Sequence, residues 1–371
     1  MCCRGGLNFE RHVIYMAALY PNSNKFMLDN KVILITGGTG SFGRKFVETV
    51  LARFKPKKLI VYSRDELKQF EMQQIWPVNG KFPIRYFIGD VRDFARLKRA
   101  MEGVDIVVHA AAFKQVPAAE YNPFEAVKTN IIGSQNVIEA AIDTGVKKVI
   151  ALGTDKAVAP INLYGATKLT ADKLFIAANN YRGGKDIKFS VVRYGNVLGS
   201  RGSVIPFFIE HRAKGFLPVT DMRMTRFSIT LEEAIDFVLQ HIKGMCGKEI
   251  FVPKIPSYRV TDVAEAIAPE CPLKIIGIRQ GDKIHEDLLT ANDAMSTVEY
   301  ENHFVILPSL QDLKKYKVAS NGKAPKAIEY GFTYTSGNNV HFLTVEEIRD
   351  LIENQLGFSL RNEPVPQSTE H

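Results

Sequence analysis

The sequence is poor in the features of disulfide-rich, metal-binding and membrane proteins. It has four cysteines in 371 residues, with Cys2 and Cys3 adjacent, and none of the four has the spacing of a metal-ligand motif. This usage is typical of a reducing compartment, so we expect a cytoplasmic protein without a metal site. No apolar run reaches the roughly 20 residues that a membrane-spanning helix needs, and we expect no membrane association.

The positive charge of the chain is not concentrated in one segment. The formal net charge is +8 at pH 7, but the sequence has no Lys/Arg block interleaved with aromatic residues, as nucleic-acid binding would favour. A mild positive field instead attracts anionic small molecules such as nucleotides. Hydrophobic residues make up 46% and charged residues 24% of the sequence, which is ordinary for a globular protein of one large domain or two closely packed ones.

Between Lys31 and Tyr194, apolar runs rich in β-branched residues alternate with stretches of helical periodicity. The expected strands are 31–36, 58–62, 84–88, 105–110, 147–152 and 189–194. Their near-continuous apolar character is typical of strands covered on both faces. Two long helices are expected at 42–54 and 124–145, the second capped by Gly145. The alternation predicts an α/β fold with a Rossmann-type, doubly wound parallel sheet.

The pattern loosens after residue 198. Helical patches lie near 203–214, 231–243 and 261–268, and short strands near 249–253 and 274–278. We expect a smaller substrate-binding lobe over 199–371, interleaved with a cofactor-binding domain over 27–198, and a mobile tail after Arg361. Residues 1–26 have a basic start and a short apolar patch but no signal-peptide pattern, so we expect a non-essential extension.

The segment ITGGTGSFGRKF follows the first expected strand and opens the first helix. Gly38, Gly40 and Gly43 satisfy the G-x-G-x-x-G pattern. Glycines permit the tight turn and let the backbone approach a pyrophosphate at the helix N-terminus. The expected contacts of a dinucleotide cofactor in this loop are Gly37, Thr39, Gly40, Ser41, Phe42 and Gly43.

The residues after the second strand bear on which dinucleotide binds. A site that prefers NAD places a carboxylate there for the ribose 2′-hydroxyl, whereas here Ser63 and Arg64 come first and Lys68 follows one helical turn later. A hydroxyl and a guanidinium suit a 2′-phosphate, so NADP is favoured, while Asp65 keeps NAD open. Further expected cofactor contacts, after the third and fourth strands, are Asp90, Val91, Ala110, Ala111, Ala112 and Lys114.

The stretch GTDKAVAPINLYGATK follows the fifth strand and gathers titratable side chains. It brings Thr154, Asp155 and Lys156 to the carboxyl edge of the sheet, where open α/β sheets bind ligands. Tyr164 and Lys168 share one face of the next helix. An ammonium beside a phenol lowers the phenol pKa, normally about 10, and the tyrosine can then take a proton from a sugar hydroxyl as hydride leaves the same carbon. The alternatives are an exposed ion pair and an ordinary helical pair.

Together these motifs resemble the extended short-chain dehydrogenases/reductases, and among them the inverting UDP-N-acetylglucosamine 4,6-dehydratases of pseudaminic acid biosynthesis. The segments that carry the resemblance, in order over about residues 27–290, are LITGGTGSFG, YSRDELKQFEM, FIGDVRD, HAAAFKQVPAAEYNP, TDKAVAPINLYGATK, VRYGNVLGSRGSVIPFF, DMRMTRF and IFVPKIPS. The resemblance implies an NADP-dependent lyase that takes UDP-N-acetylglucosamine and assembles as a homo-oligomer, a hexamer or smaller. It also implies substrate contacts at Lys114, Asn196, Ser203, Val204, Thr220, Arg226, Arg279 and Asp282.

The pair Asp155–Lys156 is the informative difference among relatives. Retaining 4,6-dehydratases have Asp-Glu there and 4-epimerases lack the pair, so Asp-Lys resembles the inverting class. The resemblance implies that, once C4 is a ketone, Lys156 removes the C5 proton and Asp155 protonates the departing C6 hydroxyl. Lys156 then reprotonates C5 from the opposite face. We therefore expect a lowered Lys156 pKa and a raised Asp155 pKa in a desolvated site.

Some positions depart from the pattern of pseudaminic acid relatives. Gln115 stands where they usually have His, as in relatives that feed capsule sugars of the N-acetyl-L-fucosamine type, yet those often lack the counterpart of Tyr164. Gly153 replaces a usual Ser, and Ser228 stands where Trp is common. The glycan pathway therefore stays open. A non-catalytic NADP-binding regulator is a further alternative, although such proteins typically lose the tyrosine or lysine that this chain keeps.

Overall fold

The computed structural model describes residues 27–78, 80–199, 203–309, 325–356 and 360. The expectations for residues 1–26 and for the tail after Arg361 lie outside these residues.

The six strands expected between Lys31 and Tyr194 form the parallel part of a ten-stranded sheet. They are β1 Val32–Thr36, β2 Lys58–Ser63, β3 Ile84–Ile88, β4 Ile106–His109, β5 Lys148–Leu152 and β6 Lys188–Val192. Their spatial order, β3-β2-β1-β4-β5-β6, is that of a Rossmann fold. Every residue of β1 is buried, as are all but the first residue of β2 and of β6. The predicted doubly wound parallel sheet is confirmed.

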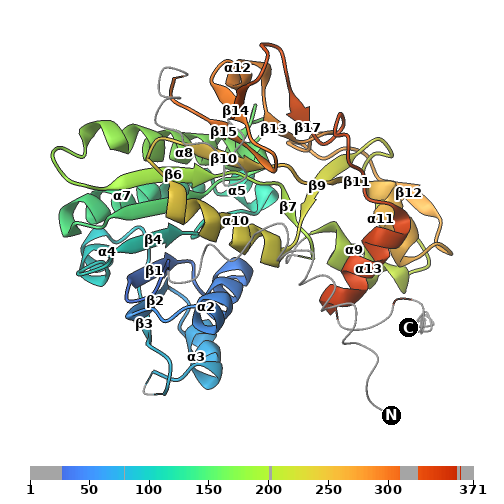
Figure 1. Ribbon diagram of the computed structural model, residues 1–371. Coiled ribbons are helices and arrows are strands. Elements are labelled where there is room, and N and C mark those ends of the chain that lie inside the picture. The colour runs from blue at the N-terminus through green and yellow to red at the C-terminus, as the bar shows by residue number, and fades with distance from the viewer. Residues whose placement is uncertain (1–26, 79, 200–202, 310–324, 357–359, 361–371) are drawn as a thin grey trace.

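Helices cover both faces of this sheet (Figure 1). α2 and α10 pack together on one face, and α4, α7 and α8 pack side by side on the other. The helices of this part of the protein include α2 Ser41–Arg53, α3 Glu66–Ile75, α4 Phe94–Ala100, α5 Val116–Tyr121, α8 Leu163–Tyr181 and α10 Leu231–Gly244. Within the described ranges, none of the helices is long and apolar enough to cross a membrane.

The helix expected over 124–145 is interrupted by a π turn at Lys128–Ile132. The turn joins α6 Pro123–Val127 to α7 Gly133–Thr144. The capping role of Gly145 is confirmed, since its φ of 76° is left-handed. Within the π turn, the buried Asn130 side chain accepts from the Phe113 N–H at 2.8 Å and donates to the Phe113 carbonyl at 2.9 Å. These bonds fix the loop after β4, which borders the site described below.

The second half of the chain contributes to the main sheet and also builds a lobe of its own. β10 Ile250–Pro253 pairs in parallel with β6, and the sheet continues through β15 His303–Ile306, β14 Thr297–Glu299 and β16 Lys326–Ala327. The lobe contains α9 Val204–Arg212, β8 Leu217–Val219, α11 Val260–Ile267, β12 Leu273–Ile275 and α13 Val345–Leu356. These helices and strands share a hydrophobic core separate from that of the main sheet.

Short strands join the lobe to the main sheet. They are β7 Asn196–Val197, β9 Thr225–Ile229, β11 Ser257–Arg259, β13 Asp287–Leu289 and β17 Tyr334–Thr335, with α12 Ala291–Ala294 after β13. The expected helices near 203–214, 231–243 and 261–268 are present as α9, α10 and α11. The expected strand over 274–278 is shorter, ending at Ile275. The sequence analysis did not identify α13.

Candidate functional site

A cavity of about 520 Å³ runs along the carboxyl edge of the parallel sheet. The expected cofactor contacts that line it are Gly37, Thr39, Gly40, Ser41, Phe42, Gly43, Ser63, Arg64, Asp90, Val91, Ala110, Ala111, Ala112, Lys114, Tyr164 and Lys168. The expected catalytic residues Thr154, Asp155 and Lys156 line it as well, together with Asn196 and Ser203. One cavity therefore joins the phosphate loop to the acid–base residues.

Two positions of the phosphate loop have no room for a side chain. Gly37 has a left-handed φ of 65°, and a Cβ there would lie 2.8 Å from the Ala111 nitrogen. A Cβ on Gly43 would lie 2.5 Å from the backbone of Gly38. No side chain caps the start of α2 at Gly40, so the first N–H groups of the helix border the cavity. This cradle suits a pyrophosphate, and the residues present fit a dinucleotide cofactor.

At the end of β2, the side chains that line the cavity are a hydroxyl and a guanidinium. The Ser63 Oγ lies 2.8 Å from the Thr39 Oγ1, and the Arg64 side chain is 63% exposed, 3.5 Å from the Asp90 carboxylate. Asp65 turns away, because its carboxylate caps α3 by accepting from the Lys68 N–H at 3.0 Å. The Lys68 ammonium pairs with that same carboxylate and does not line the cavity.

Tyr164 and Lys168 lie on the first turns of α8, which Asn162 begins by accepting from the Gly165 N–H at 2.7 Å. The Lys168 ammonium donates to the Leu152 carbonyl at 2.7 Å. Burial raises the pKa of Tyr164 to about 12, although Lys156 and a hydrogen bond with Thr154 oppose this. The expected lowering of the Tyr164 pKa is therefore wrong, because desolvation of the phenolate outweighs nearby positive charge.

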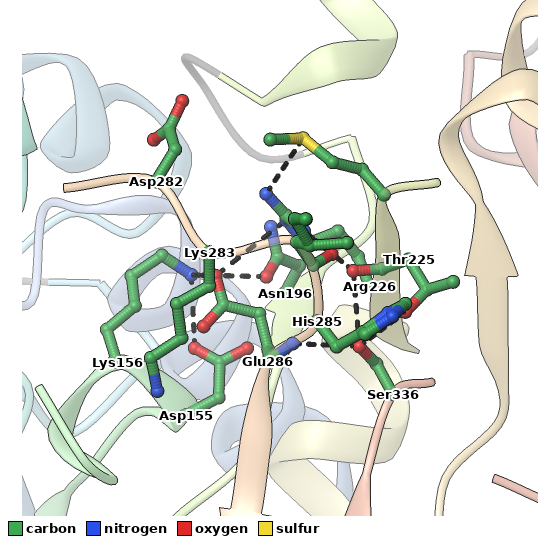
Figure 2. Close-up of polar contacts among 12 residues, drawn as sticks. Asp155, Lys156, Asn196, Thr225, Arg226, Asp282, Lys283, His285, Glu286 and Ser336 are labelled. Carbon is green, nitrogen blue, oxygen red and sulfur yellow. Dashed lines mark hydrogen bonds and ion pairs between the residues drawn. The ribbon is translucent and has the colours of Figure 1, made fainter. Parts of the chain in front are cut away.

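The Lys156 ammonium lies between two carboxylates (Figure 2). Its Nζ is 3.1 Å from the Asp155 Oδ1, 3.2 Å from the Glu286 Oε1 and 3.4 Å from the Asn196 Oδ1. Asp155 is 1% exposed, and its Oδ2 has no hydrogen-bond partner among the described residues. The residues around the Lys156 ammonium come from the 3₁₀ turn Asp155–Ala157, from β7 and from the position before β13.

The pKa of Asp155 is shifted in the expected direction, and the pKa of Lys156 is shifted in the opposite direction. Burial raises the pKa of Asp155, although Lys156 opposes it. Burial also lowers the pKa of Lys156, but the Asp155 and Glu286 carboxylates together raise it above its usual value. The expected lowering of the Lys156 pKa is therefore wrong, because the expectation rested on desolvation and the negative charges of Asp155 and Glu286 outweigh it.

Glu286 is the site residue that the sequence analysis did not identify. It is 3% exposed, and its carboxylate also lies 3.7 Å from the Arg226 Nε. Its one sequence signal is an acidic residue that directly precedes the short strand Asp287–Leu289. No local pattern relates that residue to Lys156, which lies far away along the chain.

Several expected substrate contacts lie outside the cavity lining. Arg226 faces Glu286 and donates to the carbonyls of Thr225 at 2.7 Å and Ile284 at 3.0 Å. Arg279 pairs with Asp282 at 3.0 Å on the surface, and Figure 2 shows Asp282 away from the Lys156 cluster. The remaining two are Val204, the first residue of α9, and Thr220, whose hydroxyl donates to the Met224 Sδ at 2.9 Å. In the described part of the chain, no three His, Cys, Asp or Glu side chains gather as a metal site requires.

Comparisons with known proteins agree with this geometry. Residues 33–308 match the family described as polysaccharide biosynthesis protein. A UDP-N-acetylglucosamine 4,6-dehydratase (inverting) from Campylobacter jejuni is 53% identical over 90% of this chain and 100% of its own length. A UDP-glucose 4-epimerase from Rickettsia conorii is 38% identical over 88% of this chain and 96% of its own.

A solved structure extends the likeness to three dimensions. The X-ray structure of Pen from Bacillus thuringiensis has a TM-score of 0.80 and 40% identity, over 89% of this chain and 99% of that one. The parallel sheet, the glycine loop before α2 and the Tyr164–Lys168 pair are the features of a Rossmann-type dehydrogenase. The chain therefore belongs to the polysaccharide biosynthesis protein family, within the extended short-chain dehydrogenases/reductases.

Proposed function

We propose that this protein is an NADP-dependent UDP-N-acetylglucosamine 4,6-dehydratase that inverts C5. The product is UDP-2-acetamido-2,6-dideoxy-β-L-arabino-hex-4-ulose, which we assign to pseudaminic acid synthesis, with N-acetyl-L-fucosamine-type sugars as the alternative destination. The observation that carries the proposal is the placement of Asp155, Lys156 and Tyr164 in one cavity with the phosphate loop. The Campylobacter relative named for this reaction supports it.

The first step oxidises C4. Tyr164 takes the C4 hydroxyl proton while the nicotinamide, when bound, supplies the hydride chemistry. Lys168 lies on the same face of α8 as Tyr164, and the Leu152 carbonyl of β5 holds its ammonium in place. Because the pKa of Tyr164 is about 12, its phenolate is scarce at neutral pH but is a strong base when formed.

The second step removes water across C5 and C6. Moving one proton from Lys156 to Asp155 prepares both residues for it. Transfer of a proton from the Lys156 Nζ to the Asp155 Oδ1, 3.1 Å away, gives a neutral amine and a carboxylic acid without changing the net charge. Burial favours both neutral forms. The amine then takes the C5 proton, and Asp155 gives its proton to the C6 hydroxyl, which leaves as water. Lys156 returns its proton to C5 on the opposite face, while the hydride removed from C4 in the first step would return to C6, so that the C5–C6 double bond is saturated and the cofactor would be regenerated.

The Rickettsia relative raises a second candidate, 4-epimerisation. That reaction needs chemistry at C4 alone, so it would give Asp155 and Lys156 no part to play. A buried carboxyl that lies 3.1 Å from an amine in the cavity wall favours dehydration.

Proton NMR of the reaction with UDP-N-acetylglucosamine in D₂O distinguishes the two reactions. We expect loss of the C6 hydroxyl, a new C6 methyl signal and deuterium at C5 of the inverted product. Conversion to the C4 epimer with C6 intact and no deuterium at C5 would contradict the proposal.

A further inference from the structure

Three acceptors surround the Lys156 ammonium, and they come from three separate parts of the chain. Asp155 is its neighbour in sequence, Asn196 belongs to β7, and Glu286 precedes β13. Their oxygens lie 3.1, 3.4 and 3.2 Å from the Nζ, respectively. An ammonium has three N–H donors, so these acceptors match its full hydrogen-bonding capacity. The position of this side chain is thus set by the surrounding fold.

The backbone of Glu286 is fixed independently of Lys156. Its backbone N–H donates to the Ser336 Oγ at 2.9 Å, and its carbonyl accepts from the Ser336 N–H at 2.8 Å. The two residues that follow Asp287, Leu288 and Leu289, are fully buried in the core of the main sheet. The backbone of Glu286 is therefore held in place, and it positions the carboxylate beside the Lys156 ammonium.

The residues before Glu286 also hold the backbone around Lys156. The Lys283 Nζ donates to the Val158 carbonyl at 2.7 Å, and the Asn162 Nδ2 donates to the Gly281 carbonyl at 2.8 Å. These two bonds tie the loop between the 3₁₀ turn and α8 to the segment that leads into Glu286. The loop and the Lys156 side chain are therefore restrained by one segment, 281–286.

We propose that Glu286 is a positioning residue that holds the Lys156 ammonium beside Asp155 at the cavity wall. Glu286 does not itself line the cavity, so it acts through Lys156. The inference rests on the proposed function, in which Lys156 is the C5 base. It concerns the elimination step alone, because oxidation at C4 depends on Tyr164 and Lys168, which Glu286 does not contact.

The charge of Glu286 gives the inference a second observable. Burial opposes ionisation of Glu286, but Lys156 and Arg226 lower its pKa below the usual value, so it stays anionic at neutral pH. The charged and titratable groups around Lys156 and Glu286 are Asp155, Arg226, Tyr164, Tyr258 and Lys283. Glutamine at position 286 keeps an acceptor oxygen but removes a negative charge that favours the ammonium. The Lys156 pKa then falls, and the neutral amine forms at lower pH.

The test measures the two steps separately in the full-length, cofactor-loaded protein. C4 oxidation is followed by the absorbance of reduced nicotinamide in a single turnover, and C5 exchange by NMR in D₂O. We expect Glu286→Ala to lower C5 exchange about tenfold or more while C4 oxidation changes by less than about threefold. We expect Glu286→Gln to keep most of the exchange but to move the rise of its rate with pH about one unit lower. Glu286→Asp should restore part of the exchange lost in Glu286→Ala.

Glu249→Gln is the matched control, since Glu249 is a fully buried carboxylate that bonds Ser190 and the Gly247 N–H and does not line the cavity. It should change neither the ratio of the two rates nor the pH profile. Equal loss of both steps in Glu286→Ala, or an unchanged pH profile in Glu286→Gln, would overturn the positioning role. Absence of C5 exchange in the wild type would instead overturn the proposed function and this inference with it.

Discussion

Lys156→Met removes an ammonium group while keeping an unbranched apolar side chain of similar length. If Lys156 is the C5 base, the variant oxidises C4 and then stops, because elimination requires loss of the C5 proton. Removal of a positioned base costs roughly 10²- to 10⁴-fold in rate. At about 1.4 kcal/mol for each tenfold change, this is about 3 to 5 kcal/mol of transition-state stabilisation.

The same change also affects stability, because it leaves Asp155 and Glu286 buried at 1% and 3% exposure without their shared cation. Breaking a buried ion pair by removing one partner costs about 3–5 kcal/mol. Here the cost is reduced, since the pKa of Asp155 is already raised and this carboxyl can take up a proton and become neutral. We therefore expect a folded protein with a lower melting temperature, the loss being smaller at acidic pH.

The assay mixes the variant with UDP-N-acetylglucosamine and follows reduced nicotinamide by absorbance. We expect it to accumulate close to one equivalent per site, whereas the wild type returns it within each turnover. In D₂O the sugar of the variant should gain no deuterium at C5. Lys148→Met is the control, since Lys148 is a partly buried lysine at the start of β5 that donates to the Ile242 carbonyl and does not line the cavity, and it should keep C5 exchange. If Lys156→Met exchanges C5 at the wild-type rate, another group is the base and the reasoning fails.

Four further predictions concern the site. Tyr164→Phe added to Lys156→Met should slow the accumulation of reduced nicotinamide about 10²-fold or more compared with Lys156→Met alone; an unchanged rate would remove Tyr164 from this role. In Lys156→Met, the oxidation rate should rise with pH by up to about tenfold per unit through the neutral range. The reason is that the pKa of Tyr164 is about 12, and at any pH below this value the phenolate fraction increases as the pH is raised. A flat profile would show that another group limits the step. Gly43→Ala should weaken NADP binding, measured by titration calorimetry, and lower stability by about 1–3 kcal/mol, since its Cβ would lie 2.5 Å from Gly38; unchanged values would mean that the loop tolerates a side chain. Arg64→Ala should lower the preference for NADP over NAD about tenfold, and an equal effect on both affinities would argue against contact with the 2′-phosphate.

The strands, the phosphate loop and the Tyr164–Lys168 pair could be predicted because each depends on residues close together in the sequence. The apolar runs specify buried parallel strands, and Gly37 and Gly43 stand where a Cβ would strike the backbone. The π turn and the partners of Asn130 could not be read from periodicity, since the 124–145 stretch has an ordinary helical pattern.

The electrostatics of the pair could be predicted only in part. The raised Asp155 pKa follows from burial, which a strand end at the sheet edge already indicates. The Lys156 pKa depends on Glu286, which reaches the site only through the packing of β13. Because charge interactions depend on separation in space, their sum requires the tertiary fold.

The two larger hydrophobic cores support different parts of the protein, and we expect these parts to differ in local stability. The strands that lead into the cofactor loop and the acid–base residues, and the strand after Glu286, belong to the core of the main sheet, while α9, α11 and α13 share a smaller one. Segments with fewer buried contacts open more often, so backbone amides of the lobe should exchange with solvent faster than those of β1 or β5. We propose that the lobe opens locally when the nucleotide sugar enters or leaves, while Asp155, Lys156 and Tyr164 keep their positions.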